Sequence, residues 1–172
     1  IEPLSLSIAT FYNSYSDLRS IDAYPSPPPA YYFANHHAAD TYGVELSGDL
    51  QLMTWWRLRG GYTYLDENFW STNPAVQPFS TSWEVNDPYN QFMIQSMMDL
   101  PKHWQLDSVL RYVGGIPSLS VPGYLSLDLR LAWHYKNVEL SLVGENLLDN
   151  WHPEFGSTQI PRSFYGSVTF RW

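Results

Sequence analysis

The chain has 172 residues, of which 17% are aromatic and only 15% are charged, well below the roughly 25% charged residues of soluble domains. Its net charge of -8, with 9 scattered Lys and Arg residues, excludes a surface for nucleic acid. There is no cysteine for disulfides or thiolate metal sites, and no run of about 18 apolar residues for a membrane-spanning helix. If the chain crosses a membrane, it must do so as strands of a β-barrel.

Apolar and polar residues alternate along most of the chain, and this pattern predicts an all-β fold of about eight antiparallel strands. Each strong segment has roughly the 9 to 11 residues that a tilted transmembrane strand needs. We interpret residues 1–172 as one unit of barrel strands. In chain order, the alternating segments are 4–12, 42–52, 56–64, 92–100, 104–112, 125–135, 138–142 and 164–172.

The connections between these segments alternate in length. Short ones fall near 53–55, 101–103 and 136–137, and long ones near 14–40, 67–87, 114–121 and 148–161. Bacterial outer-membrane barrels show this asymmetry, with short periplasmic turns and long extracellular loops. We therefore expect both ends of the chain in the periplasm. The start at Ile1-Glu2-Pro3, without a signal peptide, indicates a segment from within a longer protein.

Aromatic residues gather where strands are expected to end, as in the two girdles of a membrane barrel. On the short-turn side they are Trp55, Trp56, Trp104, Trp133 and Tyr135, and on the long-loop side Tyr12, Tyr42, Tyr64 and Tyr112. This placement predicts that the apolar strand faces contact outer-membrane lipid.

The opposite strand faces carry charged residues that would line the lumen of a barrel. We call these residues the charge ladder: Asp49, Arg59, Arg111, Asp128, Arg130 and Glu145. Mutual pairing across strands is favoured over contact with a substrate, and Arg111 is expected to reach Asp128. If Asp128 and Glu145 face each other, they need a cation or a shared proton.

The short turns also fix the strand register. A reversal around 53–55 sets Asp49 opposite Arg59 across the ladder. A two-residue reversal at Lys136-Asn137 sets His134 opposite Glu139.

Four motifs occur in an order and spacing that match a known family along nearly the whole chain. They are Tyr42-Gly43-Val44-Glu45-Leu46, the segment 56–66 (WRLRGGYTYLD), Asp87-Pro88-Tyr89-Asn90-Gln91 and the segment 143–149 (VGENLLD). On these motifs the chain resembles the TonB-dependent outer-membrane receptors, specifically the last third of their 22-stranded barrel. The N-terminal plug and the first strands of that barrel are not in this sequence.

The C-terminus resembles the family's barrel-assembly signal, with Val168, Phe170 and Trp172 on one face. It departs from the usual pattern in two ways. Trp is the last residue where Phe is commoner, and the usual glycine comes one place early, as Gly166. The resemblance implies that the barrel-assembly machinery reads this segment.

The resemblance also implies a role in energised nutrient import. An extracellular ligand such as a ferric siderophore, haem, cobalamin or glycan would bind the loops and the plug, and TonB would pull on the plug. This segment would supply barrel wall and loops, and would meet TonB only through the missing plug. No cofactor and no catalytic residue is expected, because the lone serines and carboxylate pairs have no catalytic setting.

Several loop residues are candidate ligand contacts, each with a simpler interpretation beside it. His36 and His37, near Asp40, have metal-ligand chemistry, but adjacent strand residues point to opposite faces, so a polar loop is favoured and no metal site is predicted. The other candidates, which could equally pack on one another at the barrel rim, are Trp70, Phe79, Trp83, His152 and Glu154.

Two other protein classes stay open. A complete eight-stranded outer-membrane barrel with a structural or adhesive role would need this many strands. A soluble lipocalin-like barrel would turn the apolar face inward around a small ligand, and alternation alone does not distinguish the two orientations. The girdles, loop asymmetry and low charge content favour the membrane barrel.

Overall fold

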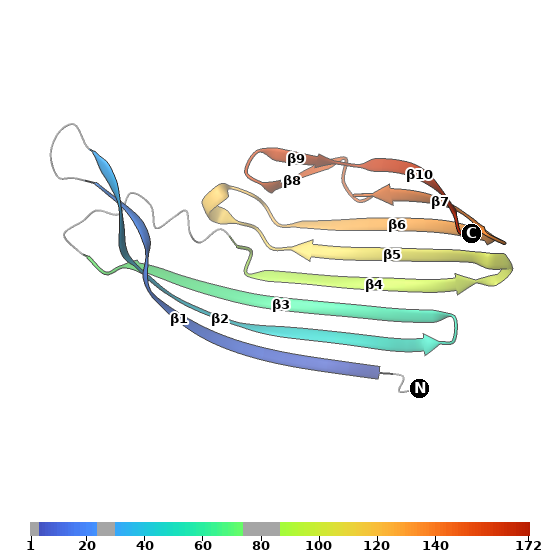
Figure 1. The fold of residues 1–172 in the computed structure, drawn as a ribbon, viewed down its shortest axis with the longest axis horizontal. Helices are drawn as coiled ribbons and strands as arrows, with labels where there is room; N and C mark the ends of the chain where they lie inside the picture. Colours follow the sequence, from blue (N-terminus) through green and yellow to red (C-terminus); the bar gives the residue numbers. More distant parts are fainter. Residues whose placement is uncertain (1–3, 24–29, 74–86) are drawn as a thin grey trace.

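The computed structural model describes residues 4–23, 30–73 and 87–172, which form one large antiparallel sheet and a small hairpin (Figure 1). The large sheet has eight strands in the order β1-β2-β3-β4-β5-β6-β7-β10, and β8 pairs only with β9. The all-β prediction and the eight-stranded count are confirmed. The strands are β1 (Leu4–Ala23), β2 (Tyr31–Met53), β3 (Trp56–Ser71), β4 (Asn90–Leu100), β5 (Trp104–Val113), β6 (Tyr124–Tyr135), β7 (Val138–Glu145), β8 (Trp151–Phe155), β9 (Thr158–Pro161) and β10 (Ser163–Phe170).

The short connections lie where the sequence predicts them. They are the turn at Thr54-Trp55, the 3-10 turn η1 (Pro101–His103) and the turn at Lys136-Asn137. Both predicted registers are confirmed, with Asp49 opposite Arg59 and His134 opposite Glu139. The start of β1 and the end of β10 lie at the same end of the sheet's strands as these turns (Figure 1).

The predicted long loops at 14–40 and 67–87 are wrong over most of the described part. Strand β1 continues to Ala23, β2 already begins at Tyr31, and β3 runs to Ser71. Register shifts between Tyr15 and Leu18 and between Leu18 and Ser20, with Asp17 at a φ of 56°, break the strict alternation in β1. Such bulges hide a continuing strand from a period-2 pattern.

The other two long connections contain local structure. Residues 114–121 hold the 3-10 turn η2 (Pro117–Leu119) and a bridge between Ile116 and Val121. Residues 148–161 hold the β8–β9 hairpin, which turns at Gly156. Neither helical turn in the described ranges is long enough to cross a membrane.

The last strand ends at Phe170 and not at Trp172 as predicted, because only one backbone bond, Arg171 N–H to Asn137 O at 2.9 Å, extends the ladder further. Val168 and Phe170 nevertheless lie on the exposed apolar face. The segment predicted as the assembly signal therefore lies on β10, an outer strand of the sheet, and Trp172 follows the end of that strand.

The sheet is a single layer, and it has little conventional core. Large apolar side chains stay exposed along one face, including Leu6 at 74% and Leu142 at 59%. Among the described residues, few apolar side chains are buried, and most of these are alanines: Ala38, Ala39, Ile116, Val121 and Ala132. Because a water-exposed apolar face of this extent is unfavourable, the sheet requires lipid or further protein on that side.

At two glycines of the sequence motifs, the neighbouring atoms leave little room for a side chain. A Cβ on Gly43 would overlap the carbonyl oxygen of Tyr64 and the ring of Phe11, so β1–β3 pack there only around glycine. A Cβ on Gly144 would lie 2.9 Å from Leu147 and 3.0 Å from Phe164. These contacts fix the path of the chain as it leaves β7.

Candidate functional site

Charged side chains on the polar face of the sheet pair with one another. Asp49 accepts hydrogen bonds from Arg57 at 2.6 and 2.5 Å and from Arg59 at 3.2 Å. Arg111 donates to Asp128 at 2.5 Å. Every arginine in these contacts thus has a carboxylate partner, which supports the pairing that the sequence favours.

Arg130 joins carboxylates from two neighbouring strands. It donates to Asp107 on β5 at 2.9 Å and also to Glu139 on β7. Glu139 accepts a further bond from Arg171 at 3.1 Å and lies 3.6 Å from His134. The network therefore ties the end of the chain to β6 and β7.

Asp128 and Glu145, which the sequence sets as possible facing carboxylates, each accept hydrogen bonds from donors of their own. Asp128 accepts the Asn146 backbone N–H at 2.9 Å in addition to Arg111. Glu145 accepts from the hydroxyls of Ser163 at 3.0 Å and Tyr165 at 3.2 Å.

His152 forms the centre of a polar cluster where the β8–β9 hairpin meets the sheet. Its side chain is 5% exposed and stacks on Tyr124, with ring centroids 4.1 Å apart. Nδ1 lies 3.1 Å from Asn146 Oδ1, and Nε2 lies 3.0 Å from Glu154 Oε1. His152 is therefore held between the hairpin and the sheet, while the Glu154 side chain stays 46% exposed.

The two histidines near the start of β2 have different surroundings. His36 Nδ1 lies 2.5 Å from Asp22 Oδ2, and its backbone N–H donates to Ser20 Oγ at 3.2 Å. Its side chain is 35% exposed, whereas His37 is buried. Across the described ranges, no three His, Asp or Glu side chains are arranged to hold a metal ion.

Of the two tryptophans predicted in the second loop, Trp70 lies on β3 and is 38% exposed, and Trp83 falls outside the described residues, as does Phe79. Glu67 lies three residues before Trp70 on β3. This part of β3 is beyond Tyr64, which pairs with Asn90, the first residue of β4. Burial raises the pKa of Glu67, and the nearby carboxylates of Asp87 and Asp66 raise it further.

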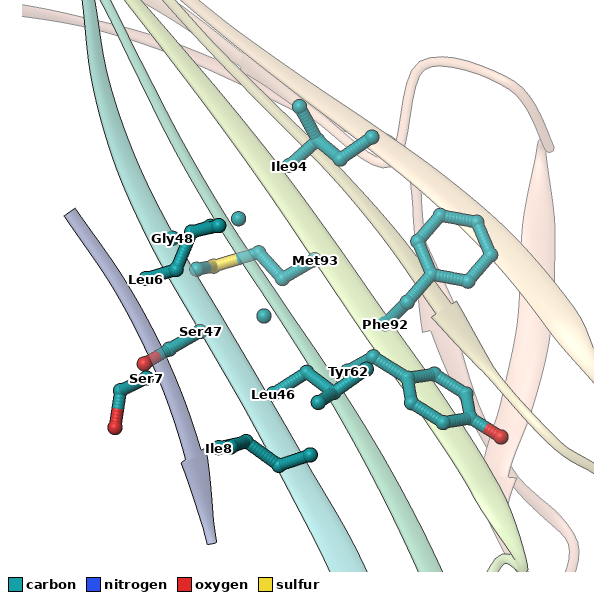
Figure 2. Close-up of a pocket in the computed structure, with 12 residues that line it drawn as sticks. Leu6, Ser7, Ile8, Leu46, Ser47, Gly48, Tyr62, Phe92, Met93 and Ile94 are labelled. Atoms are coloured by element: carbon teal, nitrogen blue, oxygen red, sulfur yellow. The ribbon is translucent and has the colours of Figure 1, made fainter. Parts of the chain in front are cut away.

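An apolar hollow lies across β1–β4 on the exposed face (Figure 2). Gly48 and Gly60 are cross-strand neighbours there and bring no side chains, while Leu6 and Ile94 continue the same row on either side. Because the hollow is on the apolar face, it is separate from the charge ladder.

Sequence reasoning missed the role of three residues in these networks. Arg57 is not among the charge-ladder residues predicted from the sequence, because its contact with Asp49 is diagonal and not directly across. Asn146 and Tyr124 come together with His152 only when the chain folds back at the hairpin. The motif around Asn146 was visible, but not its hydrogen bonds.

The fold, with one exposed apolar face, one paired polar face and tight turns at one edge, defines an antiparallel wall of a membrane β-barrel. Residues 2–147 match the family model described as TonB dependent receptor-like, beta-barrel. The chain belongs to this family, whose homologous receptors are outer-membrane proteins. No curated protein matches the chain.

Solved structures of such receptors share the fold at low sequence identity. The FrpB iron transporter from Neisseria meningitidis superposes with a TM-score of 0.77 at 11% identity, over 99% of this chain and 29% of that one. The pyoverdine outer-membrane receptor FpvA from Pseudomonas aeruginosa PAO1 gives 0.72 at 16%, over 99% and 27%. The ferric-catecholate import receptor Fiu from E. coli K12 gives 0.69 at 17%, over 98% and 25%. The chain thus spans under a third of the receptors it matches.

Proposed function

We propose that this chain is the closing wall of a TonB-dependent receptor that imports a scarce nutrient across the bacterial outer membrane. The observation that carries the proposal is the sheet itself, with an exposed apolar face, a paired polar face and a family match over most of its length. In this arrangement the apolar face contacts lipid and the charge ladder faces the lumen, toward a plug that belongs to another part of the protein.

The proposed orientation rests on the difference between the two ends of the strands. The tight turns, the start of β1 and the end of β10 lie at one end, which we assign to the periplasm. The β1–β2 hairpin, the end of β3 and the β8–β9 hairpin lie at the other end, which we assign to the extracellular side (Figure 1). Transport would depend on TonB through the plug, and assembly on recognition of the segment that ends the chain.

The structure gives no support to a complete eight-stranded barrel. In the described sheet β1 and β10 are the two outer strands and no ladder joins them. Further strands of the full receptor, about fourteen for a 22-stranded barrel, would pair with these edges.

Imported iron complexes are the ligand class that the receptors of similar fold suggest, since their descriptions include pyoverdine, ferric catecholate and iron. The test is uptake of labelled ferric siderophores, haem, cobalamin and a glycan by cells with and without the gene for the full receptor. We expect one ligand to accumulate only with the gene, with TonB and without a protonophore. Uptake that persists without TonB, or no gene-dependent uptake across these classes, would overturn the proposal.

A further inference from the structure

The β8–β9 hairpin is attached to the sheet through a histidine whose two ring nitrogens both face hydrogen-bond acceptors. We propose that this hairpin is a proton-dependent latch: His152 holds it on the sheet as an imidazolium, and loss of the proton releases it. The assignment of the latch to the extracellular mouth rests on the proposed function, but the hydrogen-bond argument does not.

The side-chain amide of Asn146 has one orientation in this cluster. Its Nδ2 donates to the carbonyl oxygen of Ile160 at 3.1 Å. Its Oδ1 is therefore the atom turned toward His152 Nδ1, 3.1 Å away, and an amide oxygen can only accept.

The other ring nitrogen also meets an acceptor. His152 Nε2 lies 3.0 Å from Glu154 Oε1. A neutral imidazole carries a single N–H and would turn a lone pair toward either the amide oxygen or the carboxylate. Only the imidazolium donates to both, so this geometry selects the protonated ring.

Burial makes that selection effective. His152 is 5% exposed and its ring is stacked on Tyr124 at an interplanar angle of 21°, which leaves little room for water to replace a lost hydrogen bond. A buried polar atom without its partner costs more than the bond itself contributes. The stacked phenol ring also favours a cation above its face.

The charged groups described on the surrounding elements contact partners other than the imidazole ring. On β5 and β6, Arg111 pairs with Asp128, which also accepts the Asn146 N–H. Beyond β9, Arg162 Nε lies 3.5 Å from the Asn146 carbonyl oxygen. Glu154 is the charged group in direct contact with the imidazole ring, and its carboxylate also has a hydrogen bond with the side chain of Tyr124.

Within the part of the chain that the structure describes, few hydrogen bonds besides those of this cluster join the hairpin to the sheet. Its strands have five and four residues, and an isolated two-stranded hairpin is marginal in water. Loss of one of the two His152 hydrogen bonds is therefore expected to release residues 151–161 more often, while the eight-stranded sheet stays intact. A latch of this kind would open the mouth of the receptor as the pH rises.

The test is amide hydrogen exchange of the full receptor in lipid nanodiscs between about pH 5.5 and pH 8.5, a range that brackets histidine titration. After correction for intrinsic exchange, we expect residues 151–161 to exchange at least about fivefold faster at the upper end. Residues 114–121, which include no titratable side chain, serve as the internal reference and should show no such step.

The decisive variant is Glu154→Gln. A carboxamide can rotate to donate to a neutral Nε2 or accept from an imidazolium, so the hairpin should stay protected throughout and the pH step should vanish. Glu139→Gln, a carboxamide replacement at the opposite end of the sheet, is the matched control and should keep the step.

Three outcomes overturn the latch. They are a flat profile in the unmodified receptor, an unchanged step in Glu154→Gln, and a hairpin that is released at every pH in that variant. Because the exchange measurement uses neither ligand nor TonB, each outcome counts against the latch alone and leaves the import proposal to its own test.

Discussion

Asp49 accepts two hydrogen bonds from the guanidinium of Arg57, at 2.6 and 2.5 Å, although the register sets Arg59 directly opposite it. Arg57 instead faces Gln51 across the ladder, so its contact with Asp49 is diagonal. Long side chains reach such diagonal neighbours on one face of a sheet. One carboxylate therefore pairs with two arginines that lie two residues apart on the same face of β3.

Replacing Asp49 should consequently cost more than replacing either arginine. Asp49→Ala leaves Arg57 and Arg59 as unpaired like charges, whereas Arg59→Gln leaves the tighter pair intact. We expect a small local loss of protection for the first change and a smaller one for the second, because these groups are solvated and water screens their attraction. Hydrogen exchange of the β2–β3 amides in the full receptor measures both. Equal effects would show that Arg57 does not carry the pairing.

The assignment of the two sheet faces makes a prediction on adjacent residues of β7. Leu142 lies on the apolar face between Leu131 and Gly166, and Ser141 lies on the polar face, where its hydroxyl is 2.8 Å from that of Ser167. Leu142→Arg would place a charge in hydrocarbon at a cost of about 2 to 4 kcal/mol, while Ser141→Arg should cost much less. Guanidinium titration of the receptor in phospholipid vesicles measures the difference. A larger loss at Ser141 would reverse the two faces.

Much of the sheet could be predicted because its hairpins are regular. Tight turns join β2 to β3 and β6 to β7, so the registers of Asp49 with Arg59 and His134 with Glu139 follow from counting residues. Where bulges interrupt β1 near Asp17, the same counting fails and the strand extension is missed.

The polar clusters were harder to predict, because they depend on distances that counting does not supply. The diagonal reach of Arg57 needs side-chain geometry. The contacts of Asn146 need the chain to return at Ile160, after a hairpin whose strands include Pro153 and Pro161 and therefore have a weak strand pattern.

Asn146 combines an unusual backbone conformation with side-chain bonds, and two variants separate these contributions. Its φ is 53°, in the left-handed region. Asn146→Gly keeps that conformation but loses the bonds to Ile160 and His152, while Asn146→Ala also adds roughly 1 to 2 kcal/mol of backbone strain. The rate of tryptic cleavage at exposed Arg162 in the intact receptor should rise in both variants, and more with Ala. Cleavage at the unmodified rate would mean that Asn146 does not anchor the hairpin.

Glu67 gives a pH dependence with a defined sign. Its pKa is raised in the folded state, by burial and then by Asp87 and Asp66, and within the described residues its Oε2 has no hydrogen-bond partner. A folded pKa above the unfolded value means that the favourable contribution is complete at low pH and is lost as the pH rises through the raised value.

Glu67→Gln should therefore leave the ends of β2 and β3 unchanged at about pH 4 and protect them a fewfold better at about pH 7, when the native carboxylate is ionised and buried. Hydrogen exchange of residues 37–41 and 67–71 in the full receptor measures this difference. Asp66→Asn is the matched control with the opposite sign, because Asp66 accepts hydrogen bonds from Tyr42 at 2.7 Å and Tyr64 at 3.1 Å and its loss should weaken the same region. Protection by Glu67→Gln that is equal at both pH values would show that the gain comes from packing and not from the removed charge.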